Sequence, residues 1–432
     1  MKKILSLILV LATLLAASTL FASCNKQSDA DLKVGVILVG DETEGYTLAH
    51  MNGIDAAVKA IESKLNKKVS ITYKKKIEEN NDCSDAAEAL VGSGCTLIIS
   101  NSYGHQDFMA EVAKKHSSVN FVAMTGDYAS ICGIDNLYNA FTDVYESRYV
   151  SGVVAGMKLK ELIDAGKIDE TKNMKDGNYK IGYVGAFNYA EVVSGYTAFY
   201  LGLKSVVSNI TMEVVYTQSW FHEQREAAGA EYLMADGCVI IGQHADSTGA
   251  PSAVQAKHVA GTYTNVYCVG YNVDMIEDAK DVILTSATNN WEVYYETLFT
   301  ALLNGEKVPT EWSEGYSKNA VGLTELNKNT VAAGTDARVT EVVEAIKNGT
   351  LQVFDTSKFT VEGKEVTTAM IDPSYYDFSG SQPKLVYEGQ KFEAIKSANG
   401  VSYFAESTFR AAPYFALRID GIVELNDVDL TK

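Results

Sequence analysis

The sequence predicts an α/β protein made of two doubly wound lobes, with a small β-rich appendage toward the C-terminal end. Three observations predict this fold class. Strand-like and helix-like segments alternate along the chain, as they do in parallel sheets covered by helices. The series pauses after residue 124 and restarts near residue 179, which indicates two separate sheets. Residues 356–432 are rich in Tyr, Phe, Val and Thr with glycine turns, which favours short strands.

The first lobe begins with VGVILVG at 34–40, a continuous apolar run ended by glycine, which is typical of a strand buried on both faces. Apolar residues then recur at steps of three and four from Met51 to Leu65, the stripe of one helical face. This βαβαβ order predicts a doubly wound parallel sheet. The remaining strands are expected at 69–73, 96–100 and 119–124, and the helices at 85–91 and 106–115.

The second lobe repeats this order of elements, although its sequence shows no obvious repeat of the first. A helix over 146–162 and a loop over 165–178, rich in Lys, Asp and Gly, separate the two series. The chain therefore holds two similar α/β halves, each with its own sheet. The expected strands of the second half are 179–185, 212–218, 238–242 and 266–271, and its expected helices are 192–207, 223–234 and a short one after 242.

The first residues predict export. Two lysines precede an uncharged apolar run over 4–20, the pattern of a signal peptide, and LFASC then places small residues directly before Cys24. This looks like a lipobox, so we expect residues 1–23 to be removed, Cys24 to carry lipid and 24–32 to form a polar tether. The alternative is an ordinary secretory signal with an incidental Cys24. We expect a protein held by lipid at the outer face of the cell membrane.

Charge and cysteine content exclude some kinds of partner and some kinds of structural site. Removing the signal peptide takes away two lysines, so the formal charge of −18 becomes −20, which argues against nucleic acid and anionic membrane as partners. The cysteines beyond Cys24 are odd in number, which rules out a fully paired disulfide framework, and they show no zinc-ligand spacing. We expect most of them to be small buried hydrophobic residues: Cys83, Cys95, Cys132, Cys238 and Cys268.

Signatures of catalysis and of cofactor binding are absent from the sequence. HEQRE at 222–226 begins like a zinc-protease helix, but Glu226 stands where the second histidine must lie. The sequence has no nucleophile elbow, no P-loop and no dinucleotide-binding glycine motif after a strand. We expect no catalytic residue, no cofactor and no metal site. A zinc-binding receptor and a membrane-anchored hydrolase stay open as less favoured alternatives.

Polar loops follow the strands of both lobes. In open α/β sheets the ligand crevice lies beyond the carboxyl ends of the strands, so these loops are expected to line a cleft between the lobes. Their rings can stack on a flat, uncharged ligand, and their amides and carboxyls can read its edge. The loops are GDETEGY (40–46), SNSYGHQD (100–107), VGAFNYAE (184–191), QSWFHEQ (218–224), QHADSTG (243–249), GYNVD (270–274) and TSATNNW (285–291).

Four segments resemble a known family: ESRYVSGVVAGMKL, GYVGAFNYAEVVSGYTAFYLGLKS, DGCVIIGQHADSTGAP and VGYNVDM. In this order they are similar to segments of the basic membrane lipoproteins, the substrate-binding proteins of ABC transporters for purine nucleosides and bases. The resemblance covers about residues 33–350. It implies a type I periplasmic-binding-protein fold, whose two lobes are joined by a three-stranded hinge and close on the ligand. The implied boundaries are lobe 1 over 33–143 and 273–305, lobe 2 over 144–272 and 306–355, and an extension over 356–432.

The resemblance also implies which ligand is bound. Members that bind nucleosides place an aspartate and a lysine on the ribose, where this chain has Asn272 and Asn289. Asp41 and Tyr46 match the acidic and aromatic residues of that branch only loosely. By contrast, QHADSTGAP and NNWEVYY are similar to the branch associated with free purine bases such as adenine. We therefore expect a purine base rather than a nucleoside, delivered to the permease of an ABC transporter.

The expected ligand-binding set combines these loops with the resemblance. One lobe would stack on the ring, and closure would bring Asp246, Ser247 and Thr248 onto its edge. A sugar receptor on the same fold is the main alternative, because stacking aromatics with Asp and Asn side chains also suit a sugar. The expected set is Asp41, Tyr46, Asn101, Ser102, Tyr103, Phe187, Trp220, Gln243, Asp246, Ser247, Thr248, Asn272, Asp274, Asn289 and Trp291.

Overall fold

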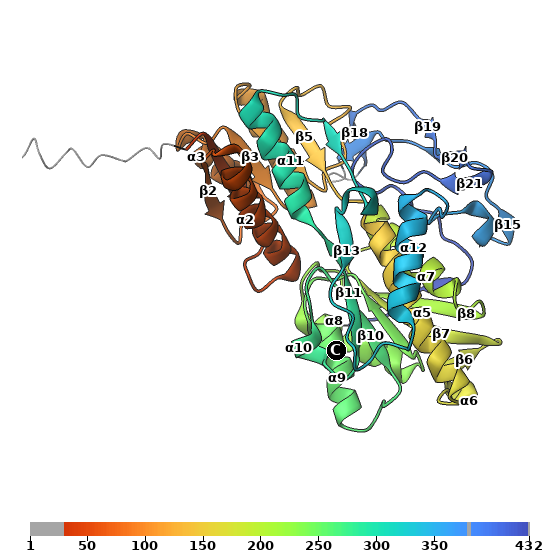
Figure 1. Ribbon diagram of the computed structural model, residues 1–432. Coiled ribbons are helices and arrows are strands. Elements are labelled where there is room, and N and C mark those ends of the chain that lie inside the picture. The colour runs from red at the N-terminus through yellow and green to blue at the C-terminus, as the bar shows by residue number, and fades with distance from the viewer. Residues whose placement is uncertain (1–29, 378–381, 431–432) are drawn as a thin grey trace, which may run out of the picture.

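The computed structural model describes residues 30–377 and 382–430, which form two α/β lobes and a C-terminal extension packed along both (Figure 1). Residues 1–29, which hold the predicted signal peptide and Cys24, lie outside the described residues. Among the helices of the described part, none is long and apolar enough to cross a membrane. The five cysteines after Cys24 are free, and all but Cys132 are buried, which confirms their expected role as small hydrophobic residues.

Lobe 1 is built on a six-stranded sheet in which every pairing is parallel. Helices α2 (Gly45–Leu65) and α11 (Trp291–Asn304) cover one face, and α3 (Asn81–Gly92) and α4 (Gln106–Lys115) cover the other. Apolar strands covered on both faces explain the continuous hydrophobic runs in the sequence. In spatial order the strands are β12 (Glu311–Trp312), β5 (Leu137–Ala140), β4 (Asn120–Met124), β3 (Leu97–Ser100), β1 (Leu32–Ile37) and β2 (Val69–Lys74).

Lobe 2 contains a second, larger sheet. Helices α5 (Val144–Asp164), α7 (Ala190–Lys204) and α12 (Thr335–Lys347) lie on one face. Helices α8 (Glu223–Ala235), α9 (Gly249–Val259) and α10 (Ile276–Ala279) lie on the other, and α6 (Glu170–Asn173) precedes the sheet. The strands, in spatial order, are β13 (Val321–Leu323), β11 (Ile283–Asn289), β10 (Tyr267–Tyr271), β9 (Ile240–Gln243), β7 (Asn178–Gly185), β8 (Ile210–Tyr216) and β22 (Ile422–Glu424), with β6 (Met174–Lys175) paired to β7.

Two glycines let helices α5 and α7 pack backbone to backbone. A Cβ atom on Gly152 would lie 2.1 Å from the carbonyl oxygen of Phe199. A Cβ atom on Gly202 would lie 2.0 Å from the carbonyl oxygen of Tyr149. Any larger residue would therefore push the helices apart. This close packing fixes α5, which starts directly after a crossing between the lobes.

The chain crosses between the lobes at three neighbouring places, after β5, after β11 and between β12 and β13. Backbone hydrogen bonds join these crossings. The Phe141 amide donates to the Trp312 carbonyl at 3.0 Å, and the Asn290 amide donates to the Ala320 carbonyl at 2.8 Å. Two lobes with largely parallel sheets, joined in this way, confirm the predicted fold class.

Two lobe boundaries differ from those expected. β11 pairs with β10 and β13, so residues 283–289 belong to lobe 2 rather than lobe 1, and α10 packs on α9 in the same lobe. Conversely, β12 pairs with β5 in lobe 1, although 306–355 was assigned to lobe 2. The expectation failed because the crossings follow the ends of strands, and these ends were not visible in the alternation of segments. The four-residue strand β5 was too short to be predicted at all.

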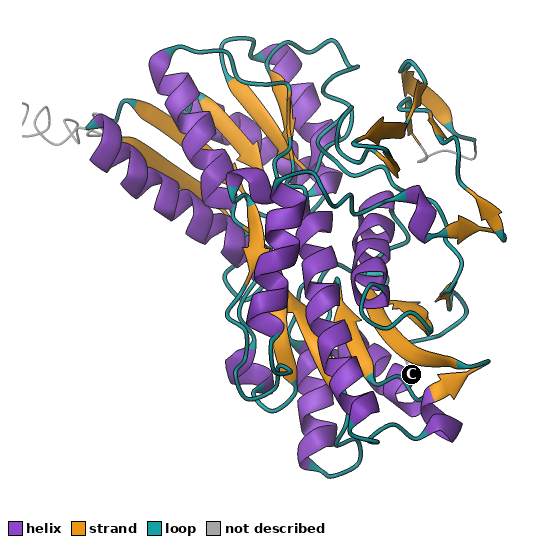
Figure 2. Ribbon diagram, turned by 45° about the vertical axis from the view of Figure 1, so that its right-hand side comes forward, coloured by secondary structure: helices purple, strands orange, loops and turns teal. Residues whose placement is uncertain are grey.

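The C-terminal extension is rich in short strands, as predicted, but it is not a separate appendage. Figures 1 and 2 show it running beside both lobes. Its core is aromatic, with the rings of Phe354 and Phe415 stacked at 4.3 Å. Its last strand, β22, joins the sheet of lobe 2 beside β8. The other strands are β14 (Thr360–Val361), β15 (Lys364–Glu365), β16 (Met370–Ile371), β17 (Tyr375–Asp377), β18 (Lys384–Tyr387), β19 (Phe392–Glu393), β20 (Ile395–Ala398) and β21 (Val401–Phe404).

Candidate ligand-binding site

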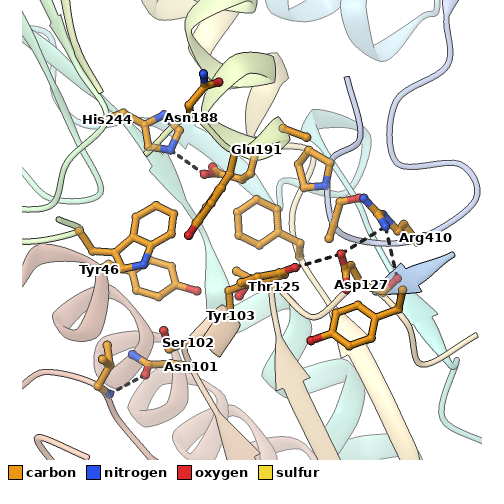
Figure 3. Close-up of a pocket in the computed structure, with 18 of the residues that line it drawn as sticks. Tyr46, Asn101, Ser102, Tyr103, Thr125, Asp127, Asn188, Glu191, His244 and Arg410 are labelled. Atoms are coloured by element: carbon orange, nitrogen blue, oxygen red, sulfur yellow. Dashed lines mark hydrogen bonds and ion pairs between the residues drawn. The ribbon is translucent and has the colours of Figure 1, made fainter. Parts of the chain in front are cut away.

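A cavity of about 750 Å³ lies between the lobes, at the carboxyl ends of their strands (Figure 3). This is where ligands bind in open α/β sheets, and the volume lies within the range of about 300–1,000 Å³ that is usual for small-molecule pockets. Lobe 1 contributes Val39, Glu44, Tyr46, Asn101, Ser102, Tyr103, Thr125, Asp127 and Phe141. Lobe 2 contributes Asn188, Tyr189, Ala190, Glu191, Trp220, His244, Asp246 and Tyr271. The extension contributes Asp372, Ser374, Tyr375, Tyr376, Asp377, Arg410, Ala412 and Pro413.

The lobes touch each other beside this cavity. The backbone N–H of Gly45, in lobe 1, donates to the carbonyl oxygen of Asp246, in lobe 2, at 3.2 Å. The rings of Tyr103 and Tyr189, again from opposite lobes, lie 6.1 Å apart. The structure is therefore a closed arrangement of the two lobes around the cavity.

Aromatic rings supply much of the wall. Trp220 meets Phe187 edge to face at 5.0 Å, and Phe187 in turn stacks on Tyr189 at 5.1 Å. On the opposite lobe, Tyr46 packs edge to face on His50 at 4.5 Å. These packed rings lose little conformational freedom when a flat ligand stacks on them, which is why aromatic side chains serve as binding platforms.

Three residues that line the cavity carry a buried polar atom with no hydrogen-bond partner among the described residues. These atoms are Tyr46 Oη, Asp127 Oδ1 and Glu191 Oε1. The second oxygen of each carboxyl is bonded: Glu191 Oε2 hydrogen-bonds to His244 Nε2 at 2.7 Å, and Asp127 Oδ2 accepts the Tyr103 hydroxyl at 3.3 Å (Figure 3). A buried polar atom without a partner costs about 1–3 kcal/mol, so each site favours a bound partner.

Asp246 ends a chain of hydrogen bonds that starts at the hinge. The Asn272 amide nitrogen donates to Asp246 Oδ1 at 2.8 Å, and the Asn289 amide nitrogen donates to Asn272 Oδ1 at 2.9 Å. The Thr142 hydroxyl donates to Asn289 at the far end. This chain fixes the orientation of the Asp246 carboxyl and leaves its second oxygen outside the chain.

The site is electrostatically unusual because several carboxyls are buried in it. Burial, and then the neighbouring carboxyl of Glu44, raises the pKa of Asp246. Burial likewise raises the pKa of Glu44. Burial lowers the pKa of His244, so this imidazole is neutral near pH 7. The raised pKa values favour the protonated forms of Asp246 and Glu44, and a protonated carboxyl can both donate a hydrogen bond to a ligand and accept one from it.

Six of the residues expected from the sequence line the cavity: Tyr46, Asn101, Ser102, Tyr103, Trp220 and Asp246. Within this group, the Asn101 amide is already engaged. Its oxygen accepts the Val39 amide at 2.9 Å, and its nitrogen donates to the Thr47 hydroxyl at 3.0 Å. Asn101 therefore shapes the end of β1 in addition to contributing surface.

Six more expected residues lie behind the wall and support it. Trp291 stacks on His50 at 4.2 Å, and His50 in turn contacts Tyr46. Gln243 donates to the Ala245 carbonyl at 2.6 Å, and the Ser247 hydroxyl accepts the Gly249 amide at 3.1 Å. The other three supporting residues contact the wall as described above. They are Phe187, which packs on Trp220, and Asn272 and Asn289, which lie in the hydrogen-bond chain to Asp246.

Three expected residues lie away from the cavity. Asp41 is paired with Lys76 at 2.6 Å near the surface. The hydrogen bond from Lys76 holds the pKa of the Asp41 carboxyl well below its usual range. Asp274 is exposed, and its carboxyl accepts the backbone amide of Ile276, the first residue of α10, at 2.7 Å. Thr248 is the residue before α9 and does not line the cavity. All three follow strands, but the side chains of Asp41 and Asp274 accept hydrogen bonds within their own turns.

The sequence reasoning missed several lining residues. Glu44, Glu191 and His244 lie within loops that had been singled out, so the loops were right and the choice of side chains was incomplete. Asp127 follows β4, a strand end that had not been considered. The lining residues of the extension had no signal in the sequence, because they reach the cavity only through long-range packing.

Among the described residues, no group of three or more His, Cys, Asp and Glu side chains is placed to hold a metal ion.

Comparison with known proteins settles the family. Residues 33–357 match the family model described as PnrA-like ABC transporter substrate-binding protein. The chain belongs to this family. The PnrA-like chain is thus an extracytoplasmic solute-binding protein of an ABC transporter and not an enzyme, and the resemblance noted in the sequence is confirmed. The match ends before β14, so the extension lies beyond it.

Three similar proteins illustrate the relationship. The PnrA-like chain is 32% identical over 331 residues to a purine-binding protein of Brucella abortus, covering 76% of this chain and 84% of the relative. It is 29% identical over 269 residues to a protein of Haloferax volcanii provisionally named as an ABC transporter glucose-binding protein, covering 62% of this chain and 61% of the relative. A solute-binding protein structure from Aeropyrum pernix shares the fold, with a TM-score of 0.59 at 14% identity over 75% of this chain and 93% of that one.

Proposed function

We propose that this PnrA-like protein captures a purine between its lobes, a free base such as adenine in preference to a nucleoside, and delivers it to the permease of an ABC importer. The proposal rests first on the family and on the Brucella relative that is named as purine-binding. It also includes a lipid anchor on Cys24 that holds the protein at the outer face of the cell membrane, where a permease can be reached.

One observation carries the choice of ligand class. The same cavity offers aromatic faces and buried polar atoms that lack partners, namely Tyr46 Oη, Asp127 Oδ1 and Glu191 Oε1. A purine has a flat ring that can stack, for about 1–3 kcal/mol per ring contact, and an edge of nitrogen donors and acceptors. Ligands that leave the buried atoms unpaired are rejected, because their desolvation is not compensated.

The preference for a base over a nucleoside is supported by the two asparagines. Asn272 and Asn289 stand where nucleoside-binding members are expected to hold the ribose, and both are uncharged. Their amides bond to each other and to Asp246, and neither lines the cavity. These positions therefore have no free group to offer to ribose hydroxyls.

The proposal is tested by calorimetric titration of the chain without its signal peptide, refolded to remove carried-over ligand. The panel contains adenine, guanine, hypoxanthine, adenosine, inosine, ribose and glucose. We expect tight binding of a base and at least tenfold weaker binding of its nucleoside, a difference of about 1.4 kcal/mol. Tighter binding of nucleosides would contradict the base preference, and binding of glucose alone would favour the sugar receptor to which the Haloferax relative points.

The lipid anchor has its own test. When the full chain is expressed in bacteria, we expect Cys24 to incorporate labelled palmitate and the protein to sediment with membranes. The Cys24→Ser variant should lose the label and appear in the soluble fraction. An unlabelled wild-type protein would contradict the anchor while leaving solute binding unaffected.

A further inference from the structure

The C-terminal extension reaches the ligand cavity although it lies beyond the part of the chain that matches the family. Asp372, Ser374 and Tyr375 approach from one segment, and Arg410 and Pro413 approach from another. The two lobes thus form only part of the wall around the cavity. The extension supplies the rest.

The attachment of the extension to lobe 2 is part of a sheet. β22 pairs in parallel with β8, from Ile422 beside Met212 to Glu424 beside Val214. The carboxyl of Glu424 accepts the hydroxyls of Tyr196 and Tyr216, each at 2.6 Å. Strand pairing together with a partly buried, hydrogen-bonded carboxyl is a lasting structural connection.

The attachment to lobe 1 is of a different kind, because it consists largely of side-chain contacts. The Tyr375 hydroxyl donates to Asp107 Oδ2 at 2.6 Å, and the Ala411 amide donates to Glu311 Oε2 at 2.9 Å. The rings of Tyr375 and Tyr128 lie 4.5 Å apart. Contacts of this kind can break without unfolding either lobe, whereas the pairing of β22 with β8 cannot.

Arg410 sits where the extension, lobe 1 and the cavity meet (Figure 3). Its guanidinium Nη1 lies 3.3 Å from Asp127 Oδ2, the oxygen that also accepts the Tyr103 hydroxyl. Both side chains of this pair are about 15% exposed. The pair thereby fixes the Asp127 carboxyl, whose other oxygen, Oδ1, is buried without a partner among the described residues.

We propose that the extension is a third wall of the ligand site, which moves with lobe 2 and docks on lobe 1 when the lobes close, and that Arg410 is the positioning residue that locks this wall to Asp127. A ligand is then enclosed by three surfaces, and its release requires the side-chain contacts of the extension with lobe 1 to break. The choice of adenine as the probe below rests on the proposed function, whereas the docking of the extension does not.

The test compares two arginines of the extension. Arg410→Gln removes the contact with lobe 1. Arg418→Gln is the matched control, because the contacts of Arg418 lie on the lobe 2 side, with Glu424 at 2.9 Å and with the side-chain oxygen of Asn188. The dissociation rate of adenine is measured by stopped-flow fluorescence of the tryptophans. We expect Arg410→Gln to raise this rate by about tenfold or more, since removing one partner of a largely desolvated charge pair acts mainly on dissociation. Arg418→Gln should change it by less than about twofold.

A second variant and a second readout keep the test decisive. Asp127→Asn/Arg410→Gln removes the pair without leaving a lone buried charge, so it should fold even if the single variant does not. Hydrogen exchange at residues 372–377, measured without ligand, should be faster in the Arg410 variants than in Arg418→Gln. Hydrogen exchange separates this proposal from the proposed purine-binding function, because it reports docking of the extension even if adenine fails to bind. Unchanged exchange and unchanged dissociation in both Arg410 variants would overturn the inference.

Discussion

Tyr46 shows how a single residue can be tuned for a ligand at a cost to the empty protein. Its ring packs on His50, and its hydroxyl is buried without a partner among the described residues. A group in this state destabilises the ligand-free fold and gains its full hydrogen-bond energy only when a ligand supplies the partner. This one oxygen atom therefore lowers the stability of the ligand-free protein and raises its affinity for the ligand.

We predict opposite effects of Tyr46→Phe on stability and on affinity. Removing the hydroxyl should raise the free energy of unfolding by about 1 kcal/mol or more and weaken purine binding by about 3–10-fold. Thermal melting with and without adenine measures both. Tyr294→Phe is the control, because its hydroxyl is also buried without a partner in the described structure but does not line the cavity. A loss of stability in Tyr46→Phe would contradict the argument.

At the residue scale, the sequence predicted part of the site. Tyr46, Trp220 and Asp246 were found because they follow strands and are chemically suited to a flat ligand. Asp127 and Arg410 could not be paired from the sequence, since 283 positions separate them and only packing brings them together. Asn272 and Asn289 were found for their positions, but the structure gives them a supporting role behind Asp246.

At the scale of elements, the hinge is held by carboxyls that are largely buried. Asp143, before α5, accepts the Ser313 hydroxyl at 2.5 Å, and Glu146 accepts the Tyr316 amide at 2.7 Å. Burial raises the pKa of Asp143 to about 7 and that of Glu146 to about 8. Both carboxyls thus link the start of α5 to the segment between β12 and β13.

The raised pKa values predict a stability that falls with rising pH. The folded state holds these protons up to about pH 7 and pH 8, whereas the unfolded chain loses them near the ordinary values of 3.8 and 4.5. The contribution of these two groups to stability is therefore greatest below about pH 4 and decreases up to about pH 8, by at most about 1.4 kcal/mol per pH unit for each group. Urea unfolding of Asp143→Asn/Glu146→Gln should show a shallower decline than the wild type. Identical pH slopes would contradict the assignment.

Elements with long, regular patterns were predicted well and short ones were not. The apolar stripe of α2 and the buried run of β1 are local properties of the chain, so the sequence contained them. β5 and β12 are too short to carry a pattern, and β11 was assigned to the wrong lobe because its partners, β10 and β13, decide where it lies. Strand pairing between distant segments is a property of the fold and not of any segment.

At the scale of the whole molecule, closure depends on a close approach at Gly45. A Cβ atom there would lie 3.2 Å from the carbonyl oxygen of Asp246 and 3.3 Å from Val273 Cγ2, both in lobe 2. A larger side chain meets no such obstacle when the lobes are apart. Substitution at this position should therefore act on closure rather than on folding.

We predict that Gly45→Val weakens purine binding by about tenfold or more while changing the melting temperature little, since valine costs less than about 1 kcal/mol in a helix. Small-angle scattering with saturating adenine should show a more open molecule than the wild type. Gly92→Val serves as the control, because a Cβ atom on Gly92 has no neighbour within 4 Å. Full affinity in Gly45→Val would show that closure does not use this contact.

The side chains that line the cavity predict that purines with a phosphate are excluded. Six carboxyl residues line it, namely Glu44, Asp127, Glu191, Asp246, Asp372 and Asp377. Arg410 is the lining arginine in the described part of the chain, and Asp127 already pairs with it. Adenosine monophosphate should bind at least about 100-fold more weakly than adenosine, because its phosphate would be buried without an unpaired cation among the described lining residues, and burying an unpaired charge is costly. Competition against labelled adenine measures this ratio, and equal affinities would contradict it.

The pairing of β22 with β8 also has a consequence for how the protein is made. Residues 422–424 leave the ribosome and the export machinery after both lobes have emerged, yet they complete the edge of the lobe 2 sheet beside residues 212–214. The segment around Arg410, which completes the cavity, emerges only slightly earlier. If the extension is the third wall of the site, as we propose, the closed cavity is complete only after the segment around Arg410 has followed both lobes out of the export machinery.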